Sequence, residues 1–149
     1  MKSLFDADTC SQILNRIDTL NQSIEPAWGK MEVGQMLHHC HFPLSLALGR
    51  YHMKKPNPLM RLIFKSFKKG MYNDTLWKPN LPTAKGFKVI DKKDFAAEKT
   101  LLVGLINDFH LEKDRKTWEP HPAFGDFTHD QWGKMQYKHL DHHLRQFGA

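Results

Sequence analysis

The chain contains 149 residues and two cysteines. A chain of this length buries about 70% of its unfolded surface without disulfides or structural metals, so we expect a single domain over residues 1–149 in which a bound metal would serve function. The two scattered cysteines do not form a disulfide framework, no signal-peptide pattern is present, and no apolar run approaches the roughly 20 residues that cross a bilayer. We therefore expect a cytoplasmic protein with reduced cysteines and no membrane span.

The formal net charge of +6 is concentrated in the middle of the sequence. Residues 50–93 contain twelve Lys and Arg side chains but only two acids, Asp74 and Asp91. Such a region attracts an anionic substrate, a lipid surface or nucleic acid, although lysines that only maintain solubility give the same composition. Because the region has no helix-turn-helix signature and no regular series of aromatic residues, we do not expect a nucleic-acid partner.

Apolar residues spaced three and four apart predict the first two long helices. The first helix is capped by Asp8 or Thr9 and ends near Asn21, before a stretch that contains proline. The second helix runs from about residue 32 to residue 50 and places its apolar side chains on one face.

A short amphipathic helix and a long connection follow. The helix starts at Pro58 and stops at Gly70, which are typical first and last positions. Its basic edge consists of Arg61, Lys65 and Lys68. Residues 71–90 are irregular, and a connection of this length in a compact domain is usually a functional cover.

Two further long helices complete the predicted architecture. Asp91 opens one of them, with Asp94 in its first turn and apolar residues as far as Phe109. The last begins with a capping-box pattern at Thr128 and runs to Phe147. The alternation typical of β-strands is missing, so we predict an all-α protein with four long helices and one short basic helix.

The last helix carries two histidines on its apolar face. His139 and His143 are four residues apart, which places them one turn apart on the same side of the helix. Buried imidazoles need partners, and a divalent metal with a third ligand from another helix satisfies a convergent pair. Hydrogen-bonded core histidines are the alternative. A metalloprotease is disfavoured because Leu140 stands where the H-E-x-x-H motif requires glutamate.

A second group of histidines lies in the second helix, around Cys40. Its members are His38, His39 and His41. Helical phase places His39 and His41 near opposite edges of the apolar face and His38 farther out, so phase alone does not choose the third ligand. Cys40 is interpreted as a small core residue, since neighbours in a helix project about 100° apart and do not form a nucleophile and base pair.

Three segments carry a resemblance to a known family: Trp28–Cys40, His121–Gly125 and Gln131–Phe147. They resemble an uncharacterised branch of the DinB/YfiT-like superfamily of metalloenzymes, and the resemblance extends over nearly the whole chain. It implies an up-down four-helix bundle. It also implies that one histidine of the second helix and an H-x-x-x-H pair of the last helix bind a divalent transition metal, most typically zinc or nickel.

The resemblance selects particular residues of this chain. The Met-Leu-x-His pattern selects His39, and the H-x-x-x-H pattern followed by glutamine selects His139, His143 and Gln146. Three additional histidines leave open a shift of the triad by one residue: His38, His41 and His142. The family pattern names no catalytic residue beyond the ligands.

Two classes of function remain open. The first is a metal-dependent enzyme, a hydrolase or a thiol-dependent transferase, in which the metal at the triad activates water or a thiol of a small-molecule substrate. Residues 71–90 would cover this site and the basic helix would flank it. The second is a non-catalytic binding module that uses the basic helix to contact an anionic partner. We also expect a homodimer formed through an apolar helix face.

Overall fold

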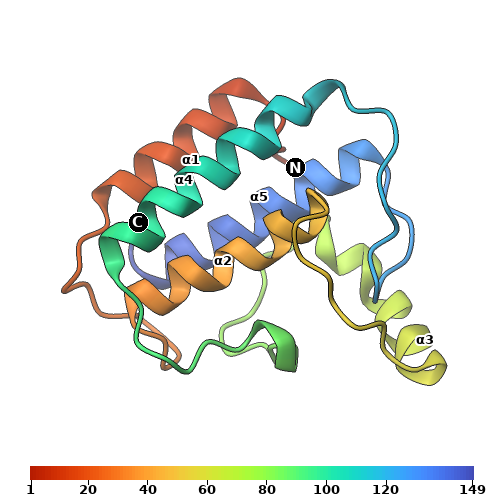
Figure 1. Ribbon diagram of the computed structural model, residues 1–149, viewed down its shortest axis with the longest axis horizontal. Helices are drawn as coiled ribbons and strands as arrows, with labels where there is room; N and C mark the ends of the chain where they lie inside the picture. Colours follow the sequence, from red (N-terminus) through yellow and green to blue (C-terminus); the bar gives the residue numbers. More distant parts are fainter.

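The computed structural model describes residues 1–149 and consists of five α-helices, three short 3-10 helices and no β-strand (Figure 1). The α-helices are α1 (Ala7–Thr19), α2 (Val33–Ala47), α3 (Pro58–Phe67), α4 (Phe95–Leu111) and α5 (His129–Gln146). The 3-10 helices are η1 (Lys68–Met71), η2 (Lys85–Phe87) and η3 (Glu112–Asp114). The all-α prediction is confirmed. None of the helices combines the length and apolarity needed to cross a bilayer.

Side-chain caps determine where the helices begin. The capping box at Thr128 is confirmed, because its side chain accepts from the Gln131 amide. The predicted start of α1 is wrong by a few residues: the cap is Asp6, whose carboxylate accepts from the Thr9 amide at 2.8 Å. The predicted start of α4 at Asp91 is also wrong, since Asp94 caps this helix. In both cases the capping carboxylate binds the backbone amide three residues after it. The spacing of apolar residues does not indicate which of several nearby polar residues makes this bond.

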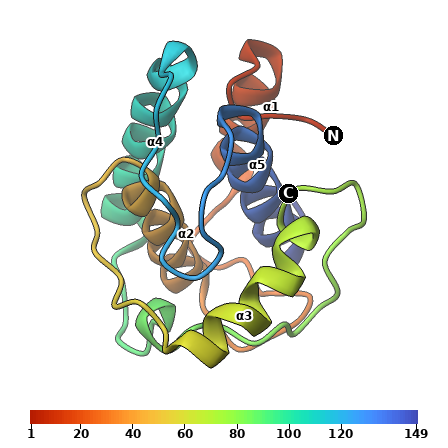
Figure 2. The same ribbon diagram turned by 90° about the vertical axis from the view of Figure 1, so that its right-hand side faces the viewer.

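Four of the helices share one hydrophobic core. Helix α2 packs on α4 and α5, and α1 packs on the other side of the same two helices (Figures 1 and 2). The largest fully buried side chains of this core are Trp132, Phe109, Phe147, Leu4, Ile13 and Ile17. Helix α3 contributes no buried residue and lies apart from the other four, below them in Figure 2.

The start of α4 lies directly against the start of α2. Gly34 faces the backbone there, and a Cβ at this position would lie 2.7 Å from the carbonyl oxygen of Lys93. The Gln35 side chain also donates to the carbonyl of Asp91 at 3.2 Å. Because a backbone carbonyl cannot move aside as a flexible side chain can, this contact requires glycine and fixes the first turn of α4 against α2.

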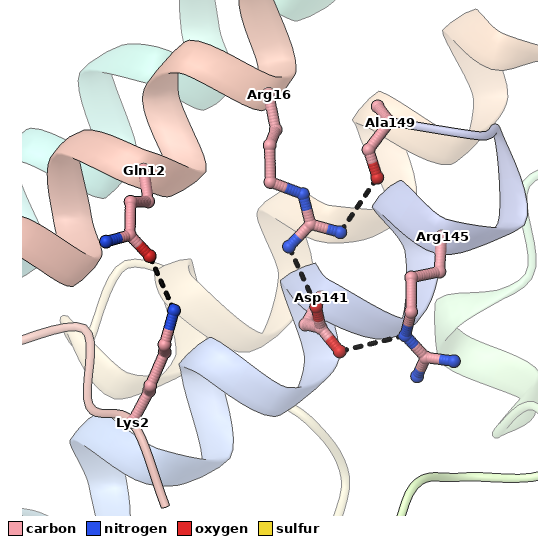
Figure 3. Close-up of polar contacts among 6 residues, drawn as sticks. All are labelled: Lys2, Gln12, Arg16, Asp141, Arg145 and Ala149. Carbon is pink, nitrogen blue, oxygen red and sulfur yellow. Dashed lines mark hydrogen bonds and ion pairs between the residues drawn. The ribbon is translucent and has the colours of Figure 1, made fainter.

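An ionic cluster holds α5 against α1. Asp141 of α5 accepts from Arg16 of α1 at 2.7 Å and from Arg145 at 2.9 Å (Figure 3). Arg16 also donates to the carbonyl of Ala149 at 2.9 Å (Figure 3). Asp141 lies midway between His139 and His143 in the sequence, so its side chain projects from the opposite side of the helix. The cluster therefore sets the rotation of α5 that turns both histidines toward α2.

We predict that Asp141→Asn lowers the free energy of unfolding by about 1–2 kcal/mol, because Arg16 loses its charged partner in a partly buried position. Thermal denaturation measures this change, at about 2–4 °C per kcal/mol for a chain of this size. The control is Asp130→Asn, which removes an exposed pair with Lys134 on the same helix and should cost about 0.5 kcal/mol or less. Equal losses in both variants would contradict the role given to Asp141.

Candidate metal centre

Three histidines from two helices meet between α2 and α5. His139 and His143 lie one turn apart on α5, and His39 of α2 faces them. A ring nitrogen from each lies within 4.8 Å of the other two. The ring centroids are 4.7 to 5.0 Å apart, so the imidazoles form a nearly equilateral group. We call His39, His139 and His143 the histidine triad; the structure brings together the three residues that the sequence analysis selected.

Burial keeps the triad in the form that binds metals. All three side chains are buried. Burial lowers the pKa of His39, and it lowers the pKa of His139 well below its usual value, with further lowering by the neighbouring imidazoles. Burial lowers the pKa of His143 to about 3. A metal ligand must be neutral, so protons compete poorly with a metal here.

Hydrogen bonds orient two of the three rings. The Nδ1 of His39 lies 2.8 Å from the carbonyl oxygen of Phe87, which can only accept, so Nδ1 carries the hydrogen. The Nδ1 of His143 donates in the same way to Oε1 of Gln146 at 2.8 Å. Each ring is then left with its Nε2 lone pair turned toward the group. Partners of this kind on the outer nitrogen are typical of histidines that bind metals.

The donor set fits a divalent transition metal. The Nε2 atoms of His39 and His139 are 3.1 Å apart, and two nitrogens bound to a tetrahedral zinc are separated by about 3.3 Å. The Nδ1 of His139 is buried and has no hydrogen-bond partner. No acceptor therefore holds a hydrogen on Nδ1, and Nε2 is kept protonated only by its neighbour His39. A cation bound by all three Nε2 lone pairs would replace the contact between His139 and His39 and would leave the hydrogen of His139 on Nδ1.

Gln146 links the triad to the segment before α2. Its Nε2 donates to the carbonyl of Trp28 at 2.7 Å while its Oε1 accepts from His143. Gly29 follows with a φ of +85°, and a Cβ there would lie 2.8 Å from Gln146 Nε2. Glycine is required both by this backbone conformation and by the close approach. Gln146, the partner of His143, is thus itself held in place by its hydrogen bond to Trp28.

The connection between α3 and α4 covers the triad, as the sequence predicts for residues 71–90. Phe87 supplies the carbonyl that binds His39. The indole of Trp77 lies edge-on to His139, with ring centroids 6.1 Å apart, and donates to the carbonyl of Gly70 at 2.8 Å. The buried Lys138 donates to the same carbonyl at 2.8 Å. The cover is therefore tied to α5 beside the site.

Helix α3 does not flank the triad in the way the sequence analysis expects. Phe64 packs edge-on against Phe124, and Lys68 binds the carbonyl of Asp126. These partners belong to the loop before α5. The triad is instead enclosed by residues of the 71–90 connection, so the basic edge of α3 can influence the site only at longer range.

The other candidate residues lie outside the triad. His142 is buried between Trp28 and Trp77, with its Nδ1 unpartnered, and burial lowers its pKa to about 4. The alternatives His38 and His41 face Glu98 of α4 instead. Cys40 is buried against Met36, and burial raises the pKa of its thiol, which agrees with a core residue and not with a nucleophile.

His121 is built into the loop before α5. Its Nδ1 accepts from the amides of Ala123 and Phe124 at 3.1 and 3.2 Å, and its ring packs near Trp132. Burial lowers the pKa of His121 to about 4. Two amide donors on one nitrogen require the neutral ring, so the residue stabilises the turn.

Sequence reasoning missed three residues beside the triad: Trp77, Phe87 and Lys138. It also missed Glu98, which faces His38 and His41 on the other side of α2. The contact between Phe87 and His39 joins residues 48 apart in the chain, and it uses a backbone carbonyl that any residue could provide. Helical spacing carries no signal for such contacts. The one available signal was Trp77 itself, the only tryptophan in residues 71–90.

The chain matches the family described as "Protein of unknown function (DUF1569)" over residues 2–149. No curated protein shows a significant match to the chain, and neither does a solved structure.

We predict that acid destabilises the protein partly through His121. The pKa of His121 is about 4 when folded against a usual 6.5, so its contribution is complete above pH 6.5 and is lost as the pH falls toward 4. One such group changes stability by about 1.4 kcal/mol per pH unit in this window. His121→Asn keeps an acceptor for the two amides but does not titrate. Urea denaturation from pH 7 to pH 4 should therefore show a shallower pH dependence for this variant.

The control for this measurement is His52→Asn at an exposed position, which should retain the pH dependence of the wild type. Parallel curves for His121→Asn and the wild type would show that the proton uptake of unfolding occurs elsewhere.

Proposed function

The chain belongs to the family of proteins of unknown function DUF1569, and we propose that it is a metal-dependent enzyme that acts on a small molecule. The observation that carries the proposal is the convergence of the three imidazoles of the triad, two of them oriented from behind by Phe87 and Gln146. Three protein ligands leave a coordination position for substrate or water, as in catalytic zinc sites.

We infer that the fold is the up-down four-helix bundle of the DinB/YfiT-like superfamily, with α3 as an additional helix. The shared core of α1, α2, α4 and α5 supports this inference, as does the placement of the ligands on α2 and α5. Zinc or nickel suits a donor set made only of imidazoles. Hydrolysis and thiol-dependent transfer are both compatible with such a site.

The metal would act as a Lewis acid and lower the pKa of a coordinated water or substrate thiol. The protein's own residues have separate tasks. Phe87 and Gln146 hold the ligands in one tautomer, and Trp77 excludes water from the side of His139. The triad group contains no carboxylate. His142, whose ring centroid lies 5.1 Å from that of His143, is the proposed proton carrier.

We predict that substituting any member of the triad removes one equivalent of bound divalent metal per chain. His39→Ala, His139→Ala and His143→Ala each delete a ligand, while Gln146→Ala should keep the metal with an affinity about 10–100-fold lower, because it removes only the partner of His143. Elemental analysis of untagged protein gives the stoichiometry, and competition with a chromophoric chelator gives the affinity.

The controls are His52→Ala and His110→Ala, which change histidines outside the site. Both should keep the metal content of the wild type. Full occupancy in His139→Ala would refute the assignment of the triad, and an equal loss in His52→Ala would point to binding by scattered surface histidines.

A second candidate function concerns α3 and does not involve the metal. Its outward face carries large apolar side chains: Leu59 and Leu62 are each 68% exposed and Phe67 is 63% exposed. Residues 50–73 contain seven Lys and Arg side chains and no acid. An apolar stripe bordered by lysines is the pattern of helices that lie in the interface of anionic membranes. We propose that α3 attaches the protein to an anionic lipid surface.

We predict that the protein sediments with vesicles of phosphatidylcholine and phosphatidylserine but not with vesicles of phosphatidylcholine alone. Leu59→Ser combined with Leu62→Ser should abolish sedimentation, because the variant loses the two most exposed apolar side chains of α3 and keeps every lysine. The matched control changes Leu101 and Leu111, two exposed leucines of α4, to serine and should leave sedimentation unchanged.

Equal sedimentation of the two double variants would refute the role of α3. Absence of sedimentation in the wild type, together with a dimer mass in light scattering that Leu62→Ser reduces to a monomer, would identify a second copy of the chain as the occupant of this face.

A further inference from the structure

A second group of potential metal ligands lies on the other side of α2. His38 and His41 are three residues apart on this helix, so their side chains lie over the same turn. Glu98, in the first turn of α4, faces them. One ligand atom from each of the three side chains lies within 4.8 Å of the other two. His39 of the triad projects roughly 160° away from His41 around the helix, so the two groups are separated by α2 itself.

The fold fixes this second group in place. The first turn of α4 is held against α2 by the close approach of Gly34 to Lys93 and by the hydrogen bond from Gln35 to Asp91. Glu98 belongs to this first turn and lies four residues after the capping Asp94. Its side chain is 12% exposed, and its ion-pair partners are the two histidines, with no Lys or Arg. A buried carboxylate is costly unless a cation compensates it.

The hydrogen-bonding pattern leaves room for a cation. The Nε2 of His41 lies 3.0 Å from the backbone carbonyl of Glu98, which can only accept, so this nitrogen carries a hydrogen. The other nitrogen, Nδ1, lies 3.4 Å from the Glu98 carboxylate. In the neutral imidazole of His41, the lone pair of Nδ1 therefore faces a carboxylate oxygen of Glu98, which is also an acceptor. The Nδ1 of His38 lies 2.9 Å from the same carboxylate oxygen, so one oxygen faces both rings.

The distances match the edges of a metal coordination shell. Zinc binds nitrogen at about 2.0–2.1 Å and carboxylate oxygen at about 2.0–2.2 Å, so neighbouring ligands of a tetrahedral ion are about 3.3–3.5 Å apart. The separation of His41 Nδ1 from the Glu98 oxygen, 3.4 Å, lies in this range, and that of His38 Nδ1, 2.9 Å, is about 0.4 Å shorter. The bond from His41 Nε2 to a backbone carbonyl is the usual outer contact of a histidine ligand.

We propose that His38, His41 and Glu98 form a second divalent metal site, distinct from the triad, that takes zinc-like ions. Two histidines and a glutamate form a common donor set of zinc sites. The His38 side chain is 28% exposed, so solvent can reach the site and supply the remaining ligand. Because the ligands come from α2 and α4, a metal bound here joins the two helices and stabilises the folded chain by mass action.

The test isolates the second site by removing the first. The double variant His139→Ala/His143→Ala loses two ligands of the triad, and titration with Zn²⁺ in a calorimeter should still show one equivalent per chain. Adding Glu98→Gln to this background should abolish that equivalent, since the amide keeps the shape of the side chain but is a far weaker ligand. The matched control, Glu112→Gln, changes a half-buried glutamate just after α4, which pairs with Arg115, and should leave the equivalent in place.

A parallel measurement uses the intact triad and does not depend on the folding of the double variant. The wild type should bind two equivalents of Zn²⁺, and Glu98→Gln alone should bind one. Zn²⁺ should also raise the melting temperature of the wild type, and this rise should be smaller in Glu98→Gln.

Each outcome bears on the proposal separately from the triad. If Glu98→Gln binds as many equivalents as the wild type, the second site is refuted, and His38, His41 and Glu98 form only a polar link between α2 and α4. If His139→Ala binds as much metal as the wild type while Glu98→Gln loses one equivalent, the second site stands and the proposed function fails.

Discussion

The burial of three imidazoles between α2 and α5 is the constraint on which the surrounding structure depends. Buried polar rings without partners would cost several kcal/mol together, and the chain satisfies the outer nitrogens of two of them with oxygens of Phe87 and Gln146. Phe87 reaches His39 from the connection before α4, and Gln146 reaches His143 from the end of α5. The inner nitrogens have only one another, which is favourable when a cation lies among them.

The remaining architecture keeps the two helices in the required rotation. Asp141 binds Arg16 on the back of α5, and the Gln136 side chain donates to the carbonyl of Pro43 on α2 at 2.8 Å. One contact sets the face that α5 turns toward α2, and the other joins α5 directly to α2. The histidines of α5 project from one side of the helix. A rotation of α5 about its axis would therefore turn His139 away from His39. The position of the triad is thus fixed by contacts outside it.

Local sequence signals predicted what helical spacing alone determines. The pair His139 and His143, the capping box at Thr128 and the all-helical content follow from periodicity and caps. The choice of His39 over its neighbours required the family resemblance, because phase left His41 open. The cover by Trp77 and the facing of His41 by Glu98 were beyond such reasoning, since both join distant segments. The starts of α1 and α4 were predicted wrongly because the capping carboxylates, Asp6 and Asp94, could not be told from other acidic residues nearby.

The run of four residues from His38 to His41 shows how a helix can divide one cluster of histidines between two environments. His39 projects toward α5, whereas His38 and His41 project toward α4, so neighbours in the sequence never share a site. Cys40 fills the core beside them. Since one helix carries histidines of both groups, a change that tilts α2 would disturb both groups at once. Coupling between two bound metals, if both are present, would therefore pass through the rotation of α2.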